Sequence, residues 1–213
     1  MKPLRGAWLV LASALALVPL TGRAATAGLP TDQLRESIDR TLKTLEDPNL
    51  RKEIAERRAA LRGIANEAFD FEEMAKRALA RHWRERTPAE QKEFVQLFAD
   101  LMERSYMSKI ELYGGEKIRY AGESVEGEQA TVRTKIVTKQ GTEVLVDYRM
   151  HRRDDRWLVY DVVIEGISLI ANYRSQFNAV IQTSTYQDLV TRMKTKAVSV
   201  AEGVKEKGTA LKP

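Results

Sequence analysis

The sequence of 213 residues contains no cysteine and only two histidines. Without cysteine there are no disulfide bonds, no thiolate metal sites and no cysteine nucleophile, and two histidines are too few for a histidine-rich metal centre. Glycine-rich phosphate loops of the G-x-x-x-x-G-K-[ST] or G-x-G-x-x-G type are also missing. These absences argue against a metal-dependent, thiol-dependent or P-loop enzyme.

The N-terminus has the pattern of an export signal. Lys2 and Arg5 precede an uncharged apolar run from Ala7 to Leu20, and small residues follow at Ala25 and Ala27. This order predicts a signal peptide over residues 1–27, cleaved after Ala27 or alternatively after Ala25. The apolar run is shorter than the roughly 20 residues that cross a bilayer, so an uncleaved anchor is the less favoured interpretation.

Cleavage also changes the charge. Removing Lys2, Arg5 and Arg23 lowers the net charge from +5 to +2. A mature protein that is nearly neutral and exported gives little reason to expect nucleic-acid binding. We expect a protein that works outside the cytoplasm.

The first half of the mature chain has helical periodicity. Apolar residues recur at helical spacing from Thr31 to a break at Pro48, and again from Leu50 to Ile64. A short helix is expected from Phe71 to Arg81, with Asp70 as its N-cap. The segment Thr87-Pro88-Ala89-Glu90 is a capping box that predicts a long fourth helix ending at Gly114-Gly115.

From Glu116 the apolar period becomes two. Three turns (residues 126–128, 140–141 and 154–155) divide this region and predict an antiparallel meander of about four strands. The last strand, residues 157–164, is apolar on both faces, so we expect cover on both sides. Strict alternation places Trp157, Val159 and Val163 on one face and Leu158, Tyr160, Val162 and Ile164 on the other.

After Gly166 the helical period returns, and a final helix is expected from about Thr185 to Ala197. The predicted fold class is therefore α+β, with helices around one curved antiparallel sheet. We expect one domain over residues 28–197, helical at 31–113 and 167–197 with the sheet at 116–165, and a flexible tail at 198–213.

No catalytic constellation emerges from the motifs. Gly166-Ile167-Ser168 begins like a nucleophile elbow but lacks the second glycine, and His82 and His151 are expected at the surface. Asp161 is the one candidate base, with Tyr160 or Tyr148 as its polarising partner. We favour the alternative in which Asp161 or Glu165 pairs with Arg174 to hold the following helix.

Basic residues gather in two segments. Arg51, Lys52, Arg57, Arg58 and Arg62 are interleaved with acids, which is typical of a solvated helix face. The group of Lys76, Arg77, Arg81, Arg84 and Arg86 has fewer nearby acids. Contact with anionic lipid or an acidic partner is an alternative for both groups.

Several motifs resemble the MlaC, or toluene-tolerance, family. The strongest are residues 157–162, 165–169 and 172–177, with the sequences WLVYDV, EGISL and NYRSQF. The earlier motifs are Phe69-Asp70-Phe71, Met74-Ala75, Trp83, Thr87-Pro88, Phe94, Phe98 and Leu112-Tyr113. The resemblance covers nearly the whole expected mature chain, from about Thr31 to Lys196.

This resemblance implies an NTF2-like sheet wrapped by helices around an apolar cavity that holds phospholipid acyl chains. It implies a periplasmic carrier that moves lipid between an outer-membrane lipoprotein–porin complex and an inner-membrane ABC transporter with an MCE-domain protein, and so maintains outer-membrane asymmetry. Bound phospholipid is the cargo, membrane contact is transient, and no cofactor, metal or enzymatic activity is expected.

The alternatives are a hopanoid-type cargo and a periplasmic module that binds only protein. Candidate cavity residues were chosen by the face they occupy on an expected strand or helix. They are Leu101, Tyr106, Val132, Val144, Val146, Tyr148, Tyr160, Val162, Ile164, Leu169, Ile170, Tyr173 and Phe177.

Overall fold

The computed structural model describes residues 28–195, so the predicted signal peptide and the predicted flexible tail lie outside the described residues. The helices are α1 (Pro30–Glu46), α2 (Ile54–Ala68), α3 (Phe71–Leu79), a 3-10 helix η1 (Ala80–Glu85), α4 (Pro88–Glu111), α5 (Leu169–Thr183) and α6 (Tyr186–Lys194). The strands are β1 (Lys117–Glu126), β2 (Gln129–Val137), β3 (Glu143–Arg153), β4 (Arg156–Ile164) and β5 (Ile167–Ser168).

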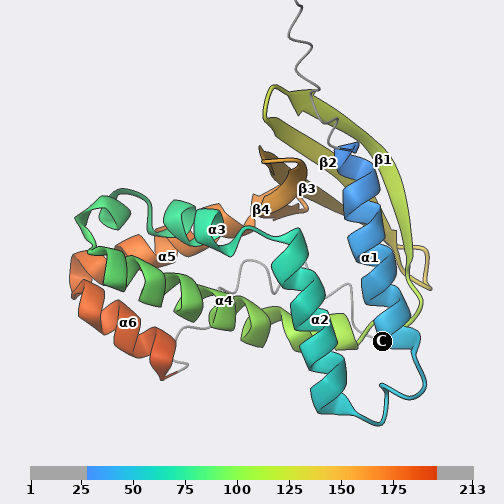
Figure 1. Cartoon of the computed structure of the whole chain (residues 1–213), viewed down its shortest axis with the longest axis horizontal. Helices are drawn as coiled ribbons and strands as arrows, with labels where there is room; N and C mark the ends of the chain where they lie inside the picture. The colour runs from blue at the N-terminus through green and yellow to red at the C-terminus, as the bar shows by residue number, and fades with distance from the viewer. Residues whose placement is uncertain (1–27, 196–213) are drawn as a thin grey trace, which may run out of the picture.

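All five strands form one curved antiparallel sheet in the order β1-β2-β3-β4-β5 (Figure 1). The α+β class and the meander are thus confirmed, and the short strand β5 is an addition. Figure 1 shows α1 crossing one face of this sheet and α3, α4, α5 and α6 gathered into a helical layer beside it.

The expected alternation of the last strand is wrong in its second half. Met150 pairs with Val159 while Arg149 pairs with Asp161, so β4 carries one extra residue, Tyr160, at a β-bulge. A bulge reverses the side-chain alternation beyond it. Val162 therefore lies on the same face of the sheet as Val159, and so does Ile164.

Two of the predicted helix starts are confirmed in detail. The Asp70 carboxylate accepts a hydrogen bond from the Glu73 amide at 2.9 Å, which caps α3. At the start of α4, the Thr87 hydroxyl accepts from the Glu90 amide while the Glu90 carboxylate accepts from the Thr87 amide. These bonds satisfy N–H groups that a helix leaves unpaired in its first turn.

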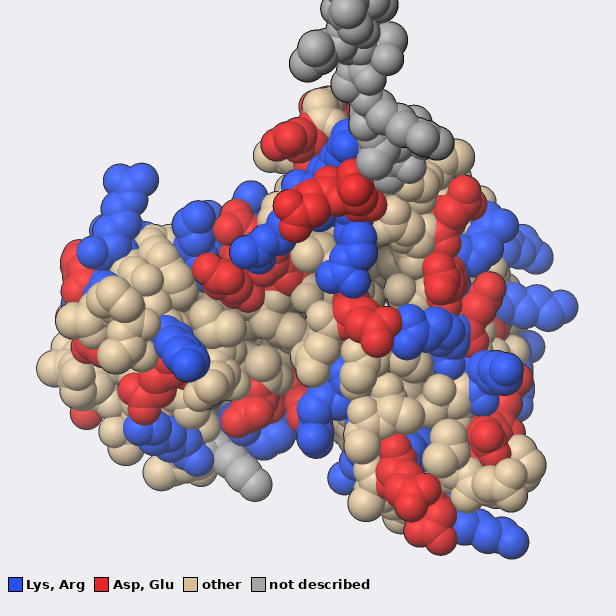
Figure 2. Space-filling view, viewed as in Figure 1, with Lys and Arg blue, Asp and Glu red and all other residues tan. Residues whose placement is uncertain are grey.

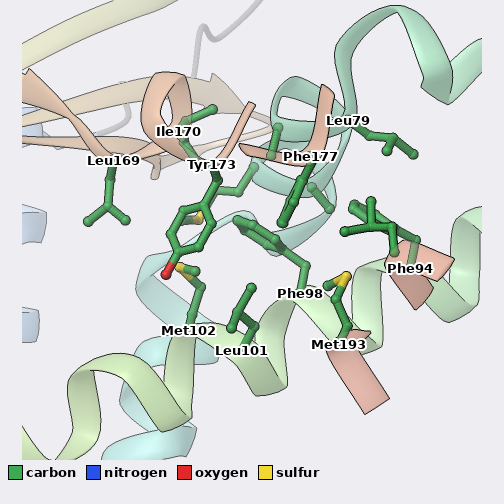
Figure 3. Close-up of a cluster of buried hydrophobic side chains, with 14 of the residues drawn as sticks. Leu79, Phe94, Phe98, Leu101, Met102, Leu169, Ile170, Tyr173, Phe177 and Met193 are labelled. Carbon is green, nitrogen blue, oxygen red and sulfur yellow. The ribbon is translucent and has the colours of Figure 1, made fainter. Parts of the chain in front are cut away.

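Most of the buried apolar side chains of residues 28–195 fall into three clusters. The largest, the helical core, joins α3, α4, α5 and α6, and is built around Phe94, Phe98, Tyr173 and Phe177 (Figure 3). A second cluster packs Leu34 of α1 on Val132, Met150 and Val159 of the sheet. The third is small and joins α1, α2 and α4 through Leu45, Leu61 and Met107.

The surface of the molecule in Figure 2 carries intermixed basic and acidic side chains. Within residues 28–195, none of the helices combines the length and apolar character that crossing a membrane requires.

Candidate functional site

An apolar surface runs across the middle of the sheet. We call it the apolar sheet face and define it by Val132, Val144, Val146, Tyr148, Val162 and Ile164. Cross-strand pairing aligns Val132, Tyr148 and Val162 in one row, and Val146 with Ile164 in the next. β-Branched and aromatic neighbours on one side of paired strands make a continuous apolar surface. The alternation of β3 and the bulge in β4 together produce this arrangement.

The polar groups within the apolar sheet face are satisfied or kept neutral. Thr134 is buried beside Val146, and its hydroxyl donates to the Val146 carbonyl at 2.8 Å. Burial raises the pKa of Tyr148 to about 12, with a smaller contribution from Tyr120. The surface therefore carries no charge at neutral pH, as contact with hydrocarbon requires.

The helical core meets the sheet along half-buried side chains. Tyr106 of α4 packs against this core from the helical side, and Val162 and Ile164 pack against it from β4. Val162 also contacts the cluster beneath α1. On this side of the sheet, α1 therefore packs against Val132, Met150 and Val159, and the helical layer packs against Val162 and Ile164.

The structure brings the thirteen candidate residues into one connected region but at different depths. Leu101, Tyr160, Leu169, Ile170, Tyr173 and Phe177 lie inside the helical core, and Tyr106, Val162 and Ile164 pack against it. Val132 lies in the cluster beneath α1, with Tyr148 packed against it. Val144 and Val146 are buried on the sheet.

Tyr173 and Phe177 are surrounded by other aromatic rings. The Tyr173 ring lies 5.7 Å from that of Phe98 in an edge-to-face arrangement, and the Phe177 ring packs edge-to-face on both Phe94 and Phe98. Such pairs add to the stability of a core beyond the area that they bury. Both residues therefore support the wall formed by α4 and α5.

Asp161 is a buried carboxylate that caps α5. It accepts hydrogen bonds from the Ser168 hydroxyl at 2.6 Å, the Ile170 amide at 3.1 Å and the Arg149 guanidinium at 3.1 Å. The predicted pairing with Arg174 is wrong, because Arg149 is the arginine that binds Asp161. Glu165 instead accepts from the Leu145 amide. With three donors already bound, Asp161 is positioned to hold the β4–α5 junction.

Asp70 is the second buried carboxylate. Besides capping α3, it accepts from the Arg153 guanidinium at 2.9 Å and lies 3.0 Å from Nε2 of His151. The His151 ring packs edge-to-face on Tyr160. His151 and His82 were both expected at the surface, and both are only partly exposed; His82 lies 3.1 Å from Asn178. The sequence gives no sign of this Asp70 cluster, because His151 and Arg153 lie 81 and 83 residues from Asp70.

A pocket of about 240 Å³ lies between α1, the end of α2 and strands β3 and β4. Its apolar floor includes Met150, Trp157 and Val159, and its rim carries Arg40 and Glu67. Pockets for drug-sized ligands measure about 300–1,000 Å³. The two acyl chains of a phospholipid therefore need more room than this pocket gives. Residues 28–195 contain no group of three or more His, Cys, Asp or Glu side chains that suits a metal ion.

Most of the basic residues that stood out in the sequence are paired within the protein. Arg57 and Arg58 both bind Glu111, and Arg62 binds Glu103. In the second group, Arg77 binds Glu73 and covers the Tyr160 ring, while Arg86 lies beside Glu85 and Glu90. Arg57, Arg58 and Arg62 thus join α2 to α4, and both groups have nearby acids.

Comparison with known proteins gives three related findings. A family model described as MlaC protein matches residues 35–195. The intermembrane phospholipid transport system binding protein MlaC of Haemophilus influenzae is 26% identical over 117 residues, which cover 52% of this chain and 55% of that protein. The match thus spans about half the length of this relative.

The third finding is a solved structure. The phospholipid-binding protein from Ralstonia solanacearum, solved in complex with a phospholipid, superposes with a TM-score of 0.70 at 24% identity. The match covers 78% of this chain and 95% of that chain. At this identity the likeness establishes a shared fold.

Proposed function

Because this chain belongs to the MlaC family, we propose that it is a periplasmic carrier that encloses the acyl chains of a phospholipid. One observation carries the proposal: the same fold holds a phospholipid in the Ralstonia protein. The transport role in the name of the Haemophilus relative gives further support. The acyl chains lie against the apolar sheet face, with Tyr106 and the helical core on the opposite side.

The energetics of transfer explain why a carrier is needed. A two-chain lipid has on the order of 30 CH₂ groups, each worth about 0.8 kcal/mol on transfer from water. Free diffusion through an aqueous compartment is therefore negligible. Transfer from a bilayer into an apolar protein interior is nearly neutral, because one apolar environment replaces another. The carrier itself then needs no nucleotide and no catalytic group.

The proposed route runs through the periplasm between an outer-membrane lipoprotein–porin complex and an inner-membrane ABC transporter with an MCE-domain protein. Contact with each membrane is transient, and the traffic maintains outer-membrane lipid asymmetry. The direction of lipid transfer is set by the relative affinities of the two partners for the lipid-loaded and the lipid-free carrier.

Native mass spectrometry of the mature protein, followed by solvent extraction, tests the proposal. We expect wild-type protein to carry a stoichiometric two-chain phospholipid, and Val146→Asp to carry none, because Val146 is 4% exposed on the apolar sheet face. Leu145→Asp is the matched control, since Leu145 is 47% exposed on the other face of the same strand. This variant is expected to keep its lipid.

If Val146→Asp fails to fold, Val146→Phe fills the same space without a charge and should lower the lipid load. A wild-type protein that is free of lipid and takes none from vesicles would instead indicate a module that binds only protein. A polycyclic lipid in the extract would identify a hopanoid cargo. If a folded Val146→Asp variant carries as much lipid as wild type, the lipid does not bind against the apolar sheet face.

A further inference from the structure

Three exposed arginines of the helical layer have no carboxylate partner. Arg81 and Arg84 belong to η1, and Arg174 belongs to α5. Among residues 28–195, none of the three takes part in an ion pair. Arg174 stays free because the two carboxylates expected to bind it, Asp161 and Glu165, bind other groups. A guanidinium group is always charged, so these side chains offer three positive charges to a partner.

Asn178 of α5 brings the three arginines together. Its Oδ1 accepts a hydrogen bond from Nη2 of Arg81 at 2.7 Å, which joins η1 to α5. Arg84 follows Arg81 by three residues in a 3-10 helix, where side chains at this spacing eclipse. Arg174 precedes Asn178 by four residues in an α-helix, where side chains at this spacing are neighbours. We call the resulting surface, defined by Arg81, Arg84 and Arg174, the arginine surface.

The acidic residues close to this surface in the sequence already bind other cations. Glu73 pairs with Arg77 at 2.8 Å, and Glu85 lies 3.3 Å from Arg86. Helix α5 contains no Asp or Glu. α3 lies alongside α5 (Figure 1), so the arginines of η1 and α5 form one local excess of positive charge. Such a surface attracts anionic groups and repels cationic ones.

The arginine surface lacks the apolar side chains with which a protein enters a bilayer. Among the described residues, the exposed large apolar side chains all lie outside α3, η1 and α5. They are Leu29, Ile54, Ile110, Leu112, Val125 and Leu145. Binding to a membrane surface combines electrostatic attraction with the burial of apolar groups. Planar guanidinium groups, in contrast, bind carboxylates through paired hydrogen bonds without an apolar contribution.

We infer that the arginine surface docks an acidic protein partner, whose Asp or Glu carboxylates bind Arg81, Arg84 and Arg174. The hydrogen bond from Arg81 to Asn178 holds one of the three guanidinium groups in place before the partner arrives. Because all three side chains are exposed, the charges act mainly by speeding association, and salt weakens their effect. This inference does not depend on what the protein carries.

A fluorescent poly-glutamate peptide is the probe, and anisotropy at low salt measures its affinity for the mature protein. We expect Arg84→Gln/Arg174→Gln to bind the peptide about three- to tenfold more weakly than wild type, because two exposed charge pairs are lost. Neither side chain has a hydrogen bond or ion pair among residues 28–195, so this variant should fold like wild type. Circular dichroism checks the fold.

Arg51→Gln/Lys52→Gln is the matched control. It removes two exposed positive charges just before α2 and leaves the net charge equal to that of the arginine variant. We expect it to bind the peptide as wild type does. An equal loss of affinity in both variants would show that only net charge matters and would overturn the inference. Failure of wild type to bind the peptide would also overturn it.

Vesicles of phosphatidylglycerol are the second probe. If wild type binds these vesicles but not the peptide, and Arg84→Gln/Arg174→Gln loses the vesicles, the surface meets a bilayer and the inference is wrong. Native mass spectrometry of the same variants should show the wild-type lipid load. The docking surface and the carrier function are therefore tested separately, and either can fail while the other stands.

Discussion

Asp161 accepts hydrogen bonds from groups on three different elements: Arg149 on β3, Ser168 on β5 and the Ile170 amide on α5. The side chain is 4% exposed, so water cannot replace these bonds. Its position follows the bulge at Tyr160, which turns Asp161 away from the apolar sheet face. One carboxylate thus fixes the angle at which α5 leaves the sheet.

Replacing Asp161 by alanine should lower the free energy of unfolding by about 2–4 kcal/mol, because a buried amide and a buried hydroxyl lose their acceptor. Urea denaturation followed by circular dichroism measures the change. Asp147→Ala, at a half-buried position on β3, is the control and should change stability by about 0.5 kcal/mol or less. Equal effects of the two substitutions would contradict the assigned role.

At the scale of elements, α2 and α4 are joined by arginine–glutamate pairs along their length. Glu111 receives both Arg57 and Arg58, and Glu103 receives Arg62. Hydrogen bonding from Arg58 outweighs burial and, with Arg57, holds the pKa of Glu111 below its ordinary value. Only a small apolar cluster with Leu61 and Met107 lies beneath these pairs. The charged pairs therefore carry much of this helix contact.

We expect Glu111→Gln to lower the free energy of unfolding by about 1–3 kcal/mol, because two arginines lose a partner whose side chain is only 12% exposed. Glu67→Gln is the control. Glu67 binds Arg40 but is 54% exposed, so its pair is largely screened by water. The measurement is denaturant unfolding at low and high salt. If Glu111→Gln is as harmless as Glu67→Gln, the pairs do not stabilise the contact.

At the scale of the whole molecule, Asp70 joins the helices to the sheet. It follows α2 and caps α3, its amide donates to the Val159 carbonyl of β4, and its carboxylate binds Arg153 of β3. Burial by itself raises the pKa of Asp70, but the bonds from the Glu73 amide and the Arg153 guanidinium outweigh it, and the net pKa is lowered.

This shift predicts a pH dependence of stability. A carboxyl whose pKa is lower in the folded state stabilises the protein above the unfolded-state pKa of about 3.9. That stabilisation is lost as the pH falls through the folded-state pKa. Asp70→Asn should therefore be less stable than wild type above about pH 5, and the difference should shrink below about pH 4. Free energies of unfolding across this range provide the measurement.

Asp155→Asn, at an exposed position in the β3–β4 turn, is the control and should follow the wild-type pH profile. A constant difference between wild type and Asp70→Asn at every pH would show that the charge of Asp70 contributes nothing.

Much of the fold could be predicted because its signals are local. The Thr87 capping box joins residues three positions apart, and the alternation of Val144, Val146 and Tyr148 depends only on the geometry of a strand. That Val132 shares their face follows from the register of β2 on β3, which only the structure shows. Their contact with lipid remains a prediction.

Other features depend on residues that are distant in the sequence, and only the tertiary structure decided them. The bulge at Tyr160 reflects how β4 pairs with β3, and it moved Val162 and Ile164 to the apolar sheet face. The partners of Asp70 lie 81 and 83 residues away, at a distance where periodicity carries no information. Local sequence sets helix starts and strand faces, because those interactions lie within a few residues. The packing of remote elements determines which polar groups meet, because those groups come together only in the folded chain.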